Sequence, residues 1–333
     1  MEKELKYKRK NLKTKIEEWG EDLEDKPRVL EKITRVKKKE INPWFMILPA
    51  FLLLLILNIF PLIWSLGISF YRFSIIIKEI PRYVGGLNYI NILTNPETWD
   101  RVIRTGIYVV YSISLQFGLS LLVTLLLFET FRGKRIIITL FMIPFMIAPV
   151  ASALIFRYLL DENLGPVNSI LNSLIGYKPL WFSTDISPLG IPYALLTVIL
   201  VETWIWTPFV TFLLLAGMSA IPQDLVEQSR ADGLKFRYKF RYVILPYIKP
   251  MMAIALIFRF MDSLKTFDSV YILTAGGPGS TTELISVYIY RVAFERWDFG
   301  SATAISYLVL VIVIFMTNVF MRYIIGVSSS EKG

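Results

Sequence analysis

Four charged side chains stand in a segment that is otherwise apolar, residues 250–273 of this 333-residue chain. A charge inside an apolar helix is costly and usually faces a water-filled path or a partner. Carboxylate, ammonium and guanidinium groups in such a place can hold ions or the hydroxyls of a polar solute. The four residues are Arg259, Asp262, Lys265 and Asp268.

Helical spacing gathers some of these groups on one face. At 100° per residue, a helix through this segment has a polar arc about 100° wide, with Lys265 about 60° beyond it and Asp268 nearly opposite. The residues of the polar arc are Arg259, Asp262, Ser263 and Thr266.

A second apolar segment, residues 189–223, is interrupted only by Glu202. An acid beside aromatic rings, facing a polar arc, is typical of a sugar site: hydroxyls bond to charged groups and C–H faces lie on the rings. We therefore predict that the two arcs together bind a solute. The residues of the second arc are Glu202, Ile205, Trp206 and Phe209.

Other interpretations of these charges remain open. Arg259 and Asp262 can form a structural ion pair, with each other or with a partner subunit, and Glu202 can serve helix packing. Cys and His are absent, which excludes disulfides, thiol nucleophiles and triads with a His base. A membrane-embedded enzyme would have only Glu202 and Asp262 as a carboxylate pair. We expect no catalytic residue and no metal site.

The elements that must position these residues are apolar runs of membrane-spanning length. A hydrocarbon core of about 30 Å needs roughly 20 apolar residues as helix, and 54% of this chain is hydrophobic. The sequence therefore predicts an all-α integral membrane protein with six transmembrane helices in a domain at residues 41–326. The expected spans are residues 42–71, 103–128, 136–158, 190–218, 250–273 and 300–325.

Lys and Arg are distributed unequally between the two sides of this arrangement. Of 36 such residues, 25 fall in segments that would share a side with the N-terminus and 9 on the opposite side. Such an excess marks the cytoplasm, so we expect a multi-pass cell membrane protein with both termini cytoplasmic. The charged tail 1–40 is expected to lie on anionic lipid, and residues 327–333 form a short C-terminal tail. Positive charge beside apolar runs does not indicate nucleic acid binding.

The loop 219–246 has the signals of two short helices on the cytoplasmic side. Pro222 opens a helix with Asp224 in its first turn, and Gly233 ends it. A second, basic helix is expected to follow and to stop near Pro246. Two short helices at an angle form an elbow whose shape suits a groove in another protein.

The sequence of this loop resembles a family motif. Glu227-Gln-Ser-Arg-Ala-Asp-Gly233, followed by Ile244-Leu-Pro246, resembles the EAA loop of binding-protein-dependent ABC importer permeases, with Gln228 and Ser229 where the family has two alanines. In that family the loop is the coupling helix, which docks into a cleft of the ATPase subunit. The resemblance implies the type I permease fold. It assigns ATPase coupling to Glu227, Ala231, Asp232, Gly233, Leu234, Ile244, Leu245 and Pro246.

Three further stretches resemble the sugar-type permeases of maltose, trehalose, glycerol 3-phosphate and related importers. They are Thr266-Phe-Asp-Ser-Val-Tyr-Ile-Leu-Thr-Ala-Gly-Gly-Pro-Gly279, Leu164-Gly-Pro-Val-Asn168 and Arg291-Val-Ala-Phe294. The matches together cover roughly residues 41–323 and leave out the tail.

The resemblance also implies where solute is contacted. It places sugar contacts at Trp206, Phe209, Ser263 and Thr266, with Arg259 one turn earlier. Maltose-type permeases are richer in Asn at the fifth-span positions, so the resemblance does not point to maltose itself.

Energy must come from another chain if this resemblance holds. The one Gly-Lys pair, Gly133-Lys134, lacks the upstream glycine and the hydroxyl residue of a Walker A loop. The expected function is a permease subunit that moves a sugar or sugar-like solute into the cytoplasm, with no cofactor on this chain and with ATP and Mg²⁺ on the ATPase. The expected partners are a second permease subunit in a heterodimer, two ABC ATPase subunits, an extracytoplasmic solute-binding protein and membrane lipid.

A stand-alone secondary transporter or channel is the alternative. It would use the buried charges as an ion relay and would explain them, but not the elbow. Such folds commonly show two similar halves, and we find no internal repeat in this sequence.

Overall fold

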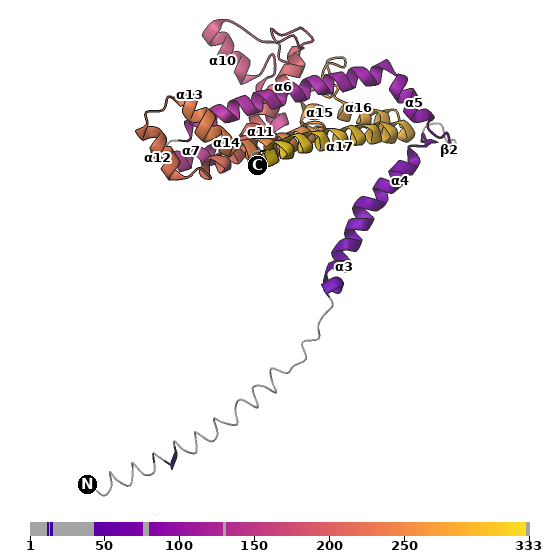
Figure 1. Cartoon of the computed structure of the whole chain (residues 1–333). Coiled ribbons are helices and arrows are strands. Elements are labelled where there is room, and N and C mark those ends of the chain that lie inside the picture. Colours follow the sequence, from indigo (N-terminus) through magenta and orange to yellow (C-terminus); the bar gives the residue numbers. More distant parts are fainter. Residues whose placement is uncertain (1–11, 13, 16–42, 76–79, 129–130, 331–333) are drawn as a thin grey trace, which may run out of the picture. The chain divides into compact units, whose positions relative to one another are not determined.

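The structure is a computed structural model, and nearly all of the residues that it describes lie in helices or in the turns between them (Figure 1). The chain divides into two compact units, residues 1–63 and 64–333. The N-terminal tail expected at 1–40 lies, apart from three positions, outside the described residues. The described residues are 12, 14–15, 43–75, 80–128 and 131–330.

The first unit contains most of one apolar helix. This helix comprises α3 (Pro43–Leu54), a π-helical turn η1 (Leu55–Ile59) and α4 (Phe60–Ile68), whose last residues belong to the second unit. Its 25-residue span from Trp44 to Ile68 has no buried residue in its most apolar window. An apolar helix with no buried residue presents a surface suited to contact with lipid or protein.

Four long helices build the second unit: α6 (Pro96–Leu126), α11 (Tyr193–Ser219), α14 (Leu245–Ser263) and α17 (Phe299–Ser330). Helix α11 packs against both α6 and α14 and is the central helix. In the most apolar 18-residue stretch of α11, 61% of the residues are buried. The corresponding share is 33% for α6 and 22% for each of the helices that contain α14 and α17. Side chains on α11 are therefore the ones best shielded from lipid.

The span expected at 136–158 is broken. The chain forms α7 (Lys134–Phe141), α8 (Ile143–Met146) and α9 (Pro149–Leu159), with a bend of 93° between the first two and the third. Ile147 and Ala148 are extended, with ψ of 135° and 134°. Pro149 explains the bend, because proline disfavours helical backbone in the residue before it.

The expectation of a span at 250–273 is wrong at both ends. One continuous helix runs from Phe236 to Ser263 through α13 (Phe236–Lys239), the π-helical turn η2 (Phe240–Ile244) and α14. The basic helix therefore does not stop near Pro246: this proline lies in the first turn of α14, after a π turn that changes the hydrogen-bond pattern. Beyond Ser263 the chain turns and begins a separate helix, α15 (Asp268–Thr274).

In the described part of the chain, five helices are long and apolar enough to cross a membrane, or six if the bent pair is one span. This agrees with the expected all-α membrane fold. Helix α17 extends to Ser330, past the expected limit of the last span at 325 and into the expected C-terminal tail.

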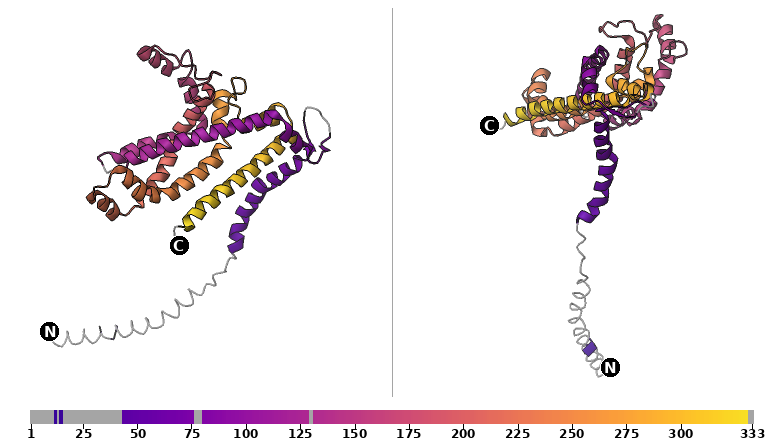
Figure 2. Two further views of the ribbon diagram at one scale, coloured as in Figure 1. Left: turned by 45° about the horizontal axis from the view of Figure 1, so that its top comes forward. Right: turned by 90° about the vertical axis from the view of Figure 1, so that its right-hand side faces the viewer.

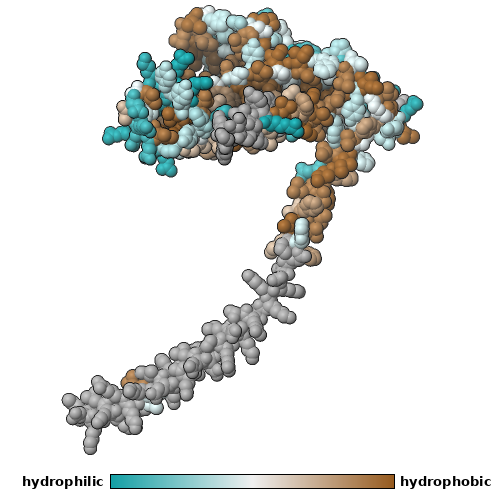
Figure 3. All heavy atoms as spheres, viewed as in Figure 1, coloured by the Kyte–Doolittle hydropathy of each residue, from teal (hydrophilic) through white to brown (hydrophobic). Residues whose placement is uncertain are grey.

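Short elements close the two ends of the long helices (Figure 2). At one end, α12 (Gln223–Ala231) and α13 form an elbow, which we call the elbow end. At the other end, which we call the hairpin end, the strands β1 (Tyr71–Arg72) and β2 (Arg82–Tyr83) pair antiparallel beside α5 (Leu87–Thr94). Figure 3 shows hydrophilic side chains gathered over the elbow end, whereas the long helices are largely hydrophobic.

The remaining elements are α10 (Pro166–Ile175), α16 (Ile285–Tyr290) and the π-helical turn η3 (Arg291–Glu295).

The Thr-Ala-Gly-Gly-Pro-Gly turn lies between α15 and α16. Buried Glu283 anchors it, because its carboxylate oxygens accept hydrogen bonds from Arg101 at 2.7 Å and from Arg291 at 2.6 Å. Arg291 also donates to the Ala275 carbonyl oxygen at 2.6 Å. Charge-assisted bonds of this kind are among the stronger ones in proteins.

The start of α17 packs tightly on β1. A Cβ added at Gly300 would lie 2.2 Å from the Tyr71 carbonyl oxygen, whereas one added at Gly106 on α6 would meet nothing within 4 Å. The backbone N–H of Phe299 donates to the Phe73 carbonyl oxygen at 2.9 Å. A side chain at position 300 would therefore push the strand away.

Gly300→Ala should destabilise the protein by about 1–3 kcal/mol, the usual cost of overpacking. The apparent Tm of the detergent-purified protein measures this. Gly106→Ala is the matched control and should leave the Tm unchanged or slightly higher, because alanine is the better helix former. Equal Tm values for the two variants would contradict the tight packing of α17 on β1.

Candidate functional site

Arg259 lies at the centre of a buried polar cluster. Its side chain is fully buried. Its Nε donates to Gln116 Oε1 at 2.9 Å, one terminal nitrogen donates to Asp262 Oδ2 at 2.6 Å, and the other donates to Ser263 Oγ at 3.2 Å. The guanidinium also lies over the Trp206 ring, 4.1 Å from its centroid. Cation–π contact and these three hydrogen-bond partners together compensate for the burial of this charge.

Glu202 is the second buried charge of this cluster. It is 1% exposed, and its Oε2 lies 3.8 Å from a terminal nitrogen of Arg259. Its Oε1 accepts a hydrogen bond from Ser269 Oγ on α15. The cluster therefore joins α6 through Gln116, α11 through Glu202, α14 through Arg259 and α15 through Ser269.

A pocket of about 270 Å³ lies beside this cluster. It forms where the helix of the fifth span ends at Ser263 and where the third span bends before Pro149. Irregular backbone at membrane depth is tolerated where it lines a cavity or is covered by protein. The lining residues are Pro149, Glu202, Trp206, Asp262, Lys265, Thr266, Phe267, Asp268 and Ser269.

Half of the residues predicted to bind solute line this pocket: Glu202, Trp206, Asp262 and Thr266. The other four do not. Arg259 and Ser263 are buried behind it, and Ile205 is 1% exposed in the apolar core. Phe209 stacks on Phe145 with ring centroids 5.3 Å apart.

The structure pairs two of the charges that the sequence places on the polar arc. Arg259 and Asp262 are paired, and the Asp262 side chain is still 43% exposed toward the pocket. Asp262 thus joins the buried cluster to the pocket surface, where it can accept a hydrogen bond from a bound molecule.

Sequence reasoning placed Asp268 opposite the polar arc and did not select Lys265, Phe267 or Ser269. That arithmetic assumed one helix through residue 273, whereas the helix ends at Ser263 and the chain turns. The turn brings Asp268 and Ser269 to the pocket. Four charges within ten residues of an apolar segment could have suggested the break.

The elbow has the expected helix end. Gly233 has φ of +63°, the left-handed region that favours glycine. The N–H of Leu234 donates to the Ser229 carbonyl oxygen at 3.1 Å, and that of Asp232 donates to the Gln228 carbonyl oxygen at 2.9 Å. Glu227 on α12 is exposed.

The predicted coupling residues divide into two groups. Ile244 is 1% exposed and belongs to an apolar cluster with Met218, Ile221 and Ile248, so it anchors the elbow to the bundle. The side chain of Leu245 is partly buried against this cluster. The remaining six are exposed: Glu227, Ala231, Asp232, Gly233, Leu234 and Pro246.

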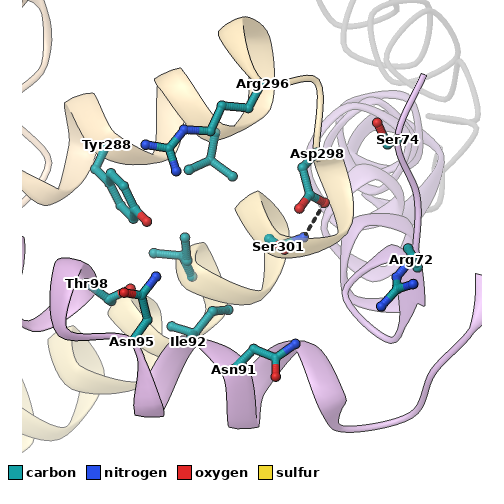
Figure 4. Close-up of a pocket in the computed structure, with 12 residues that line it drawn as sticks. Arg72, Ser74, Asn91, Ile92, Asn95, Thr98, Tyr288, Arg296, Asp298 and Ser301 are labelled. Atoms are coloured by element: carbon teal, nitrogen blue, oxygen red, sulfur yellow. Dashed lines mark hydrogen bonds between the residues drawn. The ribbon is translucent and has the colours of Figure 1, made fainter. Parts of the chain in front are cut away.

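A second, larger pocket of about 470 Å³ lies at the hairpin end (Figure 4). Arg296 lies over the Tyr288 ring at 5.4 Å and pairs with Glu97 at 3.1 Å. Partial burial lowers the pKa of Arg296, but the hydrogen bond and charge of Glu97 outweigh it and raise that pKa above its ordinary value. This pocket is separate from the Arg259 cluster and was not predicted from the sequence.

Comparison with known proteins identifies the family of this chain. Residues 41–326 match the family model described as binding-protein-dependent transport system inner membrane component. The chain therefore belongs to this family, whose members are membrane permeases of transport systems that use a binding protein.

Two relatives have names that specify the kind of transport system. The chain is 34% identical over 273 residues to a probable ABC transporter permease protein of Sinorhizobium fredii, covering 81% of this chain and 85% of the relative. It is 35% identical over 280 residues to the trehalose/maltose transport system permease protein MalF of Thermococcus litoralis, covering 84% and 92%.

A solved structure shows the same fold. A chain of a bacterial ABC transporter involved in the import of the acidic polysaccharide alginate superposes with a TM-score of 0.70 at 24% identity, covering 89% of this chain and 99% of that one. The protein is a permease of the ABC importer type.

Removal of the Arg259 guanidinium should be strongly destabilising. Arg259→Met leaves Glu202 buried without its cation, and breaking a buried pair in this way typically costs about 3–5 kcal/mol. The apparent Tm of the purified protein should fall by several degrees. Lys265→Met, an exposed cation from the pocket rim, is the matched control and should change the Tm little.

The double variant Arg259→Met/Glu202→Gln tests the cause. It should recover part of the lost Tm, because a neutral amide needs no cation. A double variant at least as unstable as the sum of the two single variants would show that Glu202 does not depend on Arg259.

Proposed function

We propose that this chain is the permease subunit of an ABC importer for a sugar or sugar-like solute, and that the pocket at the end of α14 is its solute-binding site. The chemistry of this pocket carries the proposal. It offers two exposed or half-exposed carboxylates, Asp262 and Asp268, with the ammonium of Lys265 between them in sequence. Carboxylates accept and the ammonium donates, so hydroxyls of a sugar find both kinds of partner.

The aromatic rings of the pocket supply the second half of sugar recognition. Phe267 and Trp206 both line it. One face of Trp206 is covered by the Arg259 guanidinium, so its uncovered surface and the Phe267 ring are the parts available to a C–H face of the solute. The similarity to the trehalose/maltose permease of Thermococcus litoralis supports a sugar as the solute.

The charged side chains that line the pocket favour a neutral solute over a phosphate ester. The two carboxylates outnumber the one ammonium at the pocket surface, and the buried Arg259 is paired with Glu202 and Asp262, so it adds no free cation. An anionic headgroup would meet net negative charge here. We therefore propose an uncharged sugar as the solute class.

The two ends of the bundle receive separate partners in this proposal. The excess of Lys and Arg supports a cytoplasmic elbow end, where an ABC ATPase with ATP and Mg²⁺ would dock on α12. A solute-binding protein would then deliver sugar to the hairpin end. The exposed apolar helix α3–α4 supports a second permease subunit or lipid as its cover.

Asp268→Asn should weaken sugar uptake by the reconstituted complex, because it replaces a charged acceptor in the pocket by a neutral amide. We expect KM to rise about tenfold, the equivalent of about 1.4 kcal/mol, while ATPase activity without sugar stays the same. The measurement is uptake of radiolabelled trehalose into proteoliposomes. Asp185→Asn, an exposed acid outside the pocket, is the control, and wild-type kinetics for Asp268→Asn would remove this pocket from the proposal.

Glu227→Lys should uncouple the transporter. A reversed charge on exposed α12 should abolish the ATPase stimulation produced by sugar-loaded binding protein and should leave the permease folded. Gln223→Lys, in the first turn of the same helix, controls for the added positive charge. Full stimulation in the Glu227 variant would show that α12 does not couple, and transport by the purified chain alone would favour a secondary transporter.

A further inference from the structure

Aromatic rings form a continuous row that begins in the proposed solute pocket. Phe267 lines that pocket, and its ring lies 5.1 Å from Tyr271 and 5.0 Å from Tyr290, centroid to centroid. Tyr271 and Tyr290 are also 5.0 Å apart, and Phe294 follows at 5.2 Å from Tyr290. Four rings thus lie in contact from the end of α14 to the turn η3.

The row continues to the hairpin end. Phe299, at the start of α17, lies 6.0 Å from Phe294 and 6.4 Å from Trp297. Phe73, which follows β1, lies 5.8 Å from Phe299. We call these residues the aromatic row: Phe267, Tyr271, Tyr290, Phe294, Phe299, Trp297 and Phe73.

Helical spacing explains why the rings share one face. Tyr290 and Phe294 are four residues apart on α16 and η3, and residues four apart lie on the same side of a helix. The side chains of Tyr288, Val292 and Arg296 are also spaced by four, and they line the second pocket shown in Figure 4. The segment therefore separates that polar pocket from the aromatic row.

Among the residues that the structure describes, none fully covers the outer part of the row. Phe294 is 53% exposed and Trp297 is 40% exposed. Tyr271 and Tyr290 are partly exposed, and the turn η3 that carries Phe294 also carries the charged residues Arg291 and Glu295. Rings bordered by hydroxyls and charges differ from a purely apolar packing face.

We propose that the aromatic row is a series of stacking sites along which a sugar moves from the hairpin end to the pocket. This inference rests on the proposed function of the pocket. Each ring offers a face to the C–H side of a sugar ring, while the tyrosine hydroxyls and Glu295 bond to its hydroxyls. Neighbouring centroids are 5.0–6.4 Å apart, so a sugar can contact the next ring before it leaves the last.

The direction of the row favours a solute over lipid as its occupant. Aromatic residues that anchor a protein in the bilayer form belts at the two membrane interfaces. This row instead runs from the membrane-depth pocket to the end of the bundle, and its inner end, Phe267, is a pocket residue. A path for sugar must be continuous with the pocket, whereas a membrane anchor need not be.

Single cysteines give a direct test, because the natural chain has none. Phe294→Cys and Tyr290→Cys are made in a complex whose other subunits lack reactive cysteines, and are treated in proteoliposomes with a charged, membrane-impermeant methanethiosulfonate. Tyr158→Cys, an aromatic position that is 67% exposed and lies outside the row, is the matched control. Uptake of radiolabelled trehalose, maltose and glucose is measured before and after labelling.

Both row cysteines should react from the hairpin side, and labelling should reduce uptake by about tenfold relative to the same unlabelled variant, because the charged adduct occupies the space through which the sugar would pass. Sugar-loaded binding protein should slow their labelling. Labelling at position 158 should leave uptake unchanged. Binding-protein-stimulated ATPase activity, measured in parallel, shows that the complex remains assembled.

The other outcomes overturn the inference. Reaction only with a lipid-soluble maleimide would make the row a membrane anchor, and no reaction with either reagent would make it a contact with the second permease subunit. Labelling without loss of uptake would exclude the row from the path. Absence of uptake of all three sugars by the unmodified complex would instead contradict the proposed function.

Discussion

The burial of Arg259 is the constraint on which the arrangement of this bundle depends. A guanidinium at the centre of an apolar bundle is tolerated only where it is paired and hydrogen-bonded. Gln116, Glu202 and Asp262 supply that compensation from three helices, and Ser269 ties Glu202 to a fourth. The crossing point of α6, α11 and α14 is therefore fixed by polar contacts rather than by apolar packing alone, and the pocket lies beside this crossing point.

Helix ends and bends make the pocket, and they also limit what the sequence could predict. The number of spans, the elbow with its Gly233 end and the grouping of Glu202, Trp206, Asp262 and Thr266 follow from periodicity and helix-end signals. The 93° bend before Pro149 and the end of the helix at Ser263 do not, because a hydropathy window averages over a break. Asp268 was misplaced for this reason.

Some of the candidate residues could not have been sorted by sequence at all. Arg259 and Asp262 are three residues apart, yet one is fully buried and the other is half-exposed at the pocket. Tertiary contacts with Gln116, 143 positions away, decide this difference. The aromatic row likewise joins Phe73 to residues near 299, and no local pattern links such distant segments.

The continuous helix from Phe236 to Ser263 has a mechanical consequence. It begins in the elbow and ends at the pocket, and 28 residues of helix extend about 42 Å. Its irregular turn, η2, lies in the half nearer the elbow and Pro250 lies at the midpoint, so the part beyond Pro250, which carries Arg259 and Asp262, is an uninterrupted rod. An axial displacement of the elbow must therefore move both charges together. The ion pair and the pocket wall would shift as one body, with the strain taken up in the short connection from Leu264 to Phe267.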